Sequence, residues 1–250
     1  MRRAIQSEWI KIRTVLSHKI LVLIGVGFPL IVITLAATFG DVAEGPDSIE
    51  MAEFVLGMCI VTAMLLGVVT VIGLTSEYTH NTIRPTYAAT PQRPRVLAAK
   101  LLVSSAIALV VTAFTVFASW FSGSTIFNSR GGETSIGDSK VMTVLLSTIV
   151  LAVLVTWFGF GIGLLIRNSP ASVSLLLLWP LLIEGLIQLV FALLDWDDAS
   201  KYVPYQAAIE ASGANAGSDS LGRPGGQILF AAVGLALVAC GVWIDGRRDA

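Results

Sequence analysis

The chain has 250 residues, of which 55% are hydrophobic and 13% are charged, and its formal net charge is −1. These values and a mean hydropathy of +0.80 agree with the membrane class of proteins. The residues outside the apolar segments are scattered in short pieces, which excludes an appended soluble domain with a core of its own.

Six apolar segments are each long enough to cross a bilayer, because about 20 helical residues match a hydrocarbon core of about 30 Å. In chain order the segments are Ile20–Phe39, Phe54–Thr75, Leu101–Phe121, Val141–Ile166, Ala171–Leu194 and Gln227–Ile244. We therefore expect an all-α integral membrane protein with six transmembrane helices. The first segment is longer than the apolar part of a signal peptide, so we expect it to be retained.

The charges between these segments separate by sign. With a cytoplasmic N-terminus, the inner pieces hold twelve of the sixteen Lys and Arg residues, and the outer loops hold twelve of the seventeen acids. The bias of Lys and Arg sets membrane orientation, so both termini are predicted to be cytoplasmic.

Residues 1–19 are predicted to form an amphipathic elbow helix at the inner membrane surface. Ile5, Trp9, Ile12 and Leu16 share one face at helical spacing, between basic residues. A positively charged topology anchor explains the same stretch, and the two interpretations are compatible. The transmembrane domain is then expected over residues 20–244, with a cytoplasmic tail at 245–250.

The inner loop Ser76–Lys100 is polar, contains three prolines, and is far longer than a connection between two helices needs. It can hold a short helix around Thr79–Ala89, which Pro85 would interrupt or begin. A solvated basic loop that enforces topology explains this composition, and so does a docking element for a cytosolic partner.

Three other connections have distinct patterns. Ser122–Lys140 is rich in Gly and Ser and is predicted to be irregular. Arg167–Pro170 is predicted to be a tight inner turn, because Pro170 ends one helix and opens the next. In the long outer stretch Asp195–Gly226, a short helix could start at Pro204.

Two features within the spans are candidates for a special role. A charged Glu184 near the middle of the fifth segment would cost about 2.5–3.5 kcal/mol, so it should face the bundle or a transport path. It is either a gating position or a Glu that is hydrogen-bonded to a neighbouring helix; Gln188 extends its polar stripe, and Pro180 should kink the helix. Gly159 and Gly163 permit close helix approach, within the chain or between chains.

The sequence contains no motif for catalysis. It has no Gly-Lys pair, which excludes a Walker A loop, and no HExxH motif. His18 and His80 lie near the membrane surface, so no haem or metal site is expected, and Glu184 has no catalytic partner in the spans. Cys59 and Cys240 are expected to be packing residues. We therefore expect no catalytic residue, metal or cofactor in this chain.

Two stretches resemble bacterial type-2 ABC transporter permeases. One is SEWIKIRT at Ser7–Thr14, and the other is TSEYTHNTIRPTYAATPQRPRVLAAKLL at Thr75–Leu102. The family usually has a Glu at the end of the second span, then a Gly-Thr pair, a Thr-Pro pair and basic residues. The matching positions are Glu77, Thr82, Thr90, Pro91, Arg93, Arg95 and Lys100. Asn81 replaces the usual Gly, a mild change because Asn tolerates left-handed conformations, and Pro85 replaces a small hydroxyl residue.

The resemblance implies the transmembrane subunit of an ATP-driven exporter, a multi-pass protein of the bacterial plasma membrane. A separately encoded ATPase dimer would bind ATP and Mg and dock on a coupling loop at residues 76–100. The coupling residues would be Glu77, Thr82, Arg84, Thr90, Pro91, Arg93 and Arg95. A second permease chain, identical or different, would complete the transport path, and no nucleic acid is involved. The alternatives are a membrane scaffold or immunity protein that transports nothing, and an ATP-independent secondary carrier.

Overall fold

A computed structural model of the chain describes residues 15–41, 45–83, 87, 92–213 and 220–247. Within these ranges the protein is helical and has no strand. The helices are α2 (Leu16–Phe39), α3 (Ser48–Thr79), α5 (Arg93–Ser129), α6 (Ser139–Ile166), α7 (Ser169–Leu178), the π-helical turn η1 (Trp179–Ile183), α8 (Glu184–Leu193), α9 (Asp197–Ser200), α10 (Pro204–Ser212) and α11 (Gly222–Arg247).

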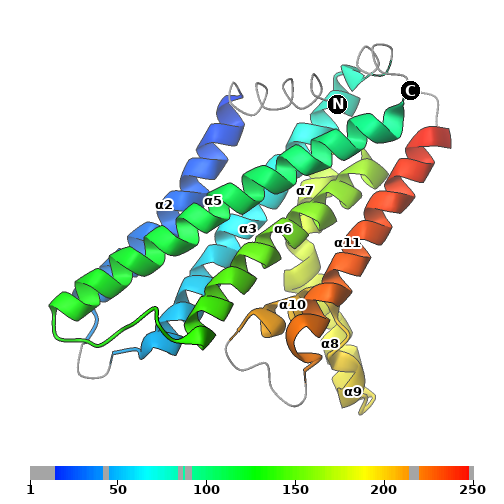
Figure 1. Cartoon of the computed structure of the whole chain (residues 1–250). Helices are drawn as coiled ribbons and strands as arrows, with labels where there is room; N and C mark the ends of the chain where they lie inside the picture. Colours follow the sequence, from blue (N-terminus) through cyan, green and yellow to red (C-terminus); the bar gives the residue numbers. More distant parts are fainter. Residues whose placement is uncertain (1–14, 42–44, 84–86, 88–91, 214–219, 248–250) are drawn as a thin grey trace.

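Six spans are long and apolar enough to cross a membrane, with α7, η1 and α8 together forming the fifth. The predicted all-α membrane fold with six spans is therefore confirmed. In the most apolar 18-residue stretch of each span, 61% of α3 and 72% of α6 is buried inside the protein, against at most 28% for the other spans. These two helices form the centre of the bundle, with α2 and α5 on one side and α11 and α10 on the other (Figure 1).

Glycines let α3 and α6 approach closely. A Cβ atom added to Gly159 would lie 3.2 Å from the carbonyl oxygen of Gly67, and one added to Gly163 would lie 3.3 Å from the side chain of Leu74. The Gly159–Gly163 pair therefore serves a helix contact within the chain, which is one of the two uses that its spacing allows.

Several boundaries differ from the sequence prediction. The stretch Ser122–Lys140 was predicted to be irregular, which is wrong for its first part, because α5 continues to Ser129. Phe127 is 4% exposed and packs into the core beside Ile33 and Met51, which holds this helical extension in place. The sixth apolar segment was predicted to end at Ile244, but α11 continues to Arg247, so that Asp245 belongs to a helix.

The positions of the proline residues predict other elements correctly. The short helix at Pro204 is present as α10, and α7 begins with Pro170 in its first turn. The preceding turn has Arg167 at φ +57°, and the Asn168 side chain accepts a hydrogen bond from the backbone of Ala171. Pro180 lies in η1, a π-helical turn. Cys59 and Cys240 are both free, and Cys59 is buried.

Candidate functional site

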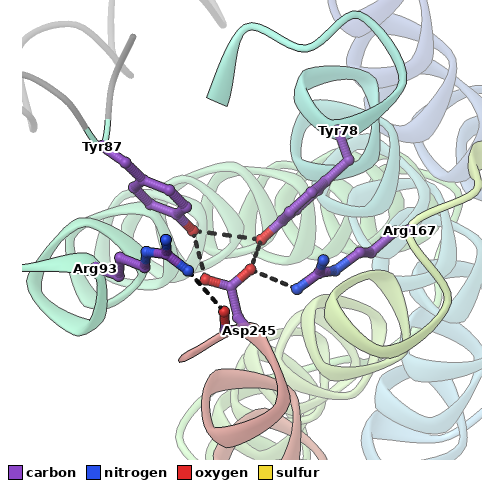
Figure 2. A network of polar contacts seen from close by, with 5 residues as sticks. All are labelled: Tyr78, Tyr87, Arg93, Arg167 and Asp245. Atoms are coloured by element: carbon purple, nitrogen blue, oxygen red, sulfur yellow. Dashed lines mark hydrogen bonds and ion pairs between the residues drawn. The ribbon is translucent and has the colours of Figure 1, made fainter. Parts of the chain in front are cut away.

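Asp245 is the centre of a polar network at the end of the bundle where α3, α6 and α11 finish. Its carboxylate Oδ1 accepts hydrogen bonds from the hydroxyl of Tyr78 at 2.9 Å and from Nη2 of Arg167 at 2.6 Å. Its Oδ2 accepts from the hydroxyl of Tyr87 at 2.9 Å. Its backbone oxygen accepts from Nη1 of Arg93, also at 2.9 Å. Figure 2 shows these five residues, which we call the Asp245 network.

The members of the Asp245 network come from separate parts of the chain. Tyr78 lies at the end of α3, Arg93 opens α5, and Arg167 caps α6 just before α7. Tyr87 lies at a helical position of the loop between α3 and α5. The network therefore connects this loop to the last turn of α11 and to the α6–α7 turn. We call this side of the bundle the network end.

Each arginine also lies over a tyrosine ring. The guanidinium of Arg167 is 4.7 Å from the ring centroid of Tyr78, and that of Arg93 is 5.2 Å from the ring centroid of Tyr87. Cation–π contacts of this kind add attraction when the site is shielded from water. The two tyrosines and two arginines thus bind each other as well as Asp245.

The electrostatics explain why the arginines are needed. Asp245 is 2% exposed, and it lies at the C-terminal end of a helix, where the helix dipole disfavours a negative charge. A buried carboxylate is tolerated only when it is paired and hydrogen-bonded. Burial is the main cause that raises the pKa of Tyr87; the hydrogen bond with Tyr78 lowers it and the one with Asp245 raises it, and the net rise keeps Tyr87 a protonated donor.

Apolar packing fixes the described part of the loop. Ile83, Tyr87 and Val96 are buried together, with Tyr78 packed against them. The turn after α3 places Asn81 at φ +54°, so this residue occupies the left-handed conformation that Asn tolerates in place of Gly. The loop is therefore attached to the bundle by both apolar and polar contacts.

A second buried ion pair lies beside the Asp245 network. Nζ of Lys100 on α5 is 2.6 Å from Oε1 of Glu77 on α3. The Lys100 side chain is 4% exposed and that of Glu77 is 9% exposed. This ion pair fixes α3 to α5 one position before Tyr78.

The structure places only part of the predicted coupling residues. Arg93 joins the Asp245 network, Glu77 is buried against Lys100, and Thr82 and Arg95 are exposed. Arg84, Thr90 and Pro91 lie outside the described residues, as do Ile5, Trp9 and Ile12 of the predicted elbow helix. Leu16, the last member of that stripe, is exposed at the start of α2.

The two candidates in the fifth span differ in their surroundings. Glu184 is 2% exposed and accepts hydrogen bonds from Trp179 and from the backbone of α10, whereas Gln188 is half-buried. The carboxylate thus faces the bundle, as its cost in lipid predicts.

Sequence reasoning missed Tyr78, Tyr87, Arg167 and Asp245 as site residues. A signal was present, because Asp245 is one of only four acids in the predicted inner pieces, and Arg167 and Arg93 are predicted on the same side. The partners themselves could not be predicted, since they are brought together by the crossing of α3, α6 and α11.

Comparisons with known proteins identify the family. No curated protein matches the chain. The family model described as "ABC-2 family transporter protein" matches residues 4–136, which is more than half of the 250 residues. The matched stretch includes both motif segments and the Tyr78, Tyr87 and Arg93 members of the Asp245 network. The chain therefore belongs to the ABC-2 family of transporter membrane proteins and is a multi-pass permease subunit of an ABC transporter.

Proposed function

We propose that the chain is the transmembrane subunit of an ATP-driven exporter, and that the ATPase binds at the network end. The observation that carries this proposal is the Asp245 network, which joins the loop between α3 and α5, and the two helix ends that flank it, to the ends of α6 and α11. A loop that only connected α3 to α5 would not need such buried polar contacts to the ends of two other helices.

In this proposal the network end faces the cytoplasm, as the charge bias of the sequence predicts. Both termini are then cytoplasmic, and residues 1–19 form an elbow helix on the inner membrane surface. A separately encoded ATPase dimer binds ATP and Mg, and a second permease chain completes the transport path.

The network supplies a way to transmit movement. When the ATPase dimer closes on ATP, it displaces the loop between α3 and α5. Tyr87 and Arg93 pass this displacement to Asp245 on α11, and Arg167 passes it to the α6–α7 turn. Breaking a buried ion pair by removing one partner costs about 3–5 kcal/mol, so the joined segments are expected to move together.

The test is copurification of the tagged chain from its native membrane in a gentle detergent, with mass spectrometry of the bound proteins. We expect a P-loop ATPase in stoichiometric amount and ATP hydrolysis by the purified complex. A second permease sequence in the sample would indicate a heterodimer. A chain that reproducibly purifies without an ATPase, even after crosslinking, would contradict the proposal and favour a scaffold or an ATP-independent carrier.

A further inference from the structure

The short helix α10 enters the bundle without crossing it. Its nine residues span about 14 Å, less than half of a hydrocarbon core of about 30 Å. Its side chains Tyr205, Ala208, Ala211 and Ser212 are nevertheless at most 6% exposed, and it packs against α6 and α11. Figure 1 shows α10 at the end of the bundle where α8 finishes and α11 begins, opposite the network end. α10 is therefore a short helix that packs on one end of the bundle without spanning it, and we call this side the α10 end.

The N-terminus of α10 is capped by a residue from another helix. Val203, at the N-cap position, has no side-chain hydrogen bond to offer. Instead, Oε1 of Glu184 accepts from the backbone N–H of Tyr205 at 2.9 Å, and Oε2 accepts from that of Gln206, also at 2.9 Å. A carboxylate at a helix N-terminus satisfies unpaired N–H groups and is stabilised by the helix dipole.

The π-helical turn η1 orients Glu184 toward this contact. The backbone N–H of Glu184 donates to the carbonyl of Trp179, five residues earlier, and the indole Nε1 of Trp179 donates to Oε1 of Glu184 at 2.8 Å. In a regular α-helix, side chains five residues apart would point about 140° away from each other. The wider π turn brings Trp179 and Glu184 to the same face, as π-bulges at functional sites often do.

Glu184 is also the point at which the outer half of the fifth span is held. It is the one buried residue of α8, whereas Leu186, Leu189 and Leu193 are each more than half exposed. A buried aromatic cluster supports the joint, because Phe158 contacts Trp179 and Phe230 contacts Tyr205.

The C-terminus of α10 is bound to the sixth span. Nε of Arg223 donates to the carbonyl of Ala211 at 2.9 Å, and Nε2 of Gln227 donates to Oγ of Ser212 at 3.0 Å and to the carbonyl of Ser147 at 3.2 Å. Polar side chains from the fifth and sixth spans thus hold α10 at its two ends.

We propose that Glu184 is a positioning residue through which the fifth span holds α10 in place against α6 and α11 at the α10 end. α10 then changes position when the fifth span moves in the transport cycle. This second step rests on the proposed function, since the movement is driven by the ATPase. The contact by which Glu184 holds α10 does not depend on the proposed function.

The test measures access to a buried position of α10. Ala208 is fully buried, so Ala208→Cys is introduced into the full chain carrying Cys59→Ala and Cys240→Ala, in native membranes. A membrane-impermeant maleimide added at the α10 end is expected to label this parent slowly. Glu184→Leu should raise the labelling rate about fivefold, the effect expected for loss of a helix N-cap. Glu184→Gln, which keeps one acceptor oxygen, should give a rate between the two.

Two controls keep the test decisive. Glu210→Gln alters the exposed side of the same helix and should leave the rate unchanged. Size-exclusion chromatography of each variant shows whether it is folded. If Glu184→Leu is not folded, the labelling rate of Glu184→Gln is compared with that of the parent instead.

Labelling is then repeated on the complex with its ATPase, trapped with ATP and vanadate. We expect trapping to change the labelling rate of the parent and to have little effect on the labelling rate of Glu184→Leu. Equal rates in the parent and the Glu184 variants would overturn the hold of Glu184 on α10, and a parent rate that trapping leaves unchanged would overturn the movement. A chain that binds no ATPase but shows the Glu184 dependence would contradict the proposed function and still support the hold on α10.

Discussion

At the scale of single residues, the two buried acids at the network end show how charge is tolerated in this bundle. Asp245 has Arg167 at 2.6 Å, and Glu77 has Lys100 at 2.6 Å. Such pairs add little stability compared with apolar residues of the same size, but removing one partner is costly. We infer that the role of these groups is to fix which segments meet at this end.

The Lys100–Glu77 pair gives the first prediction at this scale. Lys100→Met leaves the Glu77 carboxylate buried without that cation, so we expect the free energy of unfolding to fall by about 3–5 kcal/mol. Adding Glu77→Gln should recover most of the loss. Denaturant unfolding of the purified chain in detergent micelles measures both effects.

A matched control is Lys201→Met. The partner of Lys201 is Asp198, whose side chain is 99% exposed, and removing an exposed pair should cost less than about 1 kcal/mol. If Lys100→Met were no less stable than Lys201→Met, the Lys100–Glu77 pair could not be a buried ion pair.

At the scale of helices, the sequence predicted the features that depend on the length of apolar runs and on the positions of proline. Apolar runs predicted the six spans, and Pro204 and Pro170 predicted the start of α10 and the turn before α7. It could not predict contacts made between helices. The extension of α5 depends on Phe127 packing against α2 and α3, and the cap on α10 depends on Glu184, about 20 residues earlier. The π turn contains Pro180, and a proline in a span predicts a disturbed helix but not the form of the disturbance.

The α3–α6 contact gives a prediction for the central helices. Gly159→Val would place side-chain atoms against the carbonyl oxygen of Gly67 and the side chain of Val71. Overpacking of this kind costs about 1–3 kcal/mol, so we expect a lower melting temperature in detergent. The same substitution at Gly57, where an added Cβ meets nothing within 4 Å, should leave the melting temperature nearly unchanged. Equal melting temperatures for the two variants would refute the close contact of α3 with α6.

At the scale of the whole molecule, α6 and α11 connect the two ends of the bundle. α11 carries Asp245 at the network end and Gln227 at the α10 end. α6 is capped by Arg167 at the network end, and at the α10 end it supplies the carbonyl of Ser147 to Gln227. A displacement of the loop at the network end therefore has a continuous packed route to α10.

The measurement that tests this account most directly is the response of α10 to ATP in an Asp245→Asn variant. The substitution keeps the shape of the side chain and removes the charge that pairs with Arg167. Maleimide labelling of Ala208→Cys is followed in the complex with and without vanadate trapping, with the exposed Asp198→Asn as control.

We predict that Asp245→Asn still binds the ATPase in normal stoichiometry but loses most of the change in labelling that trapping causes. A full change in labelling in Asp245→Asn, equal to that of the parent and of Asp198→Asn, would contradict the claim that the Asp245 network couples the ATPase to the spans.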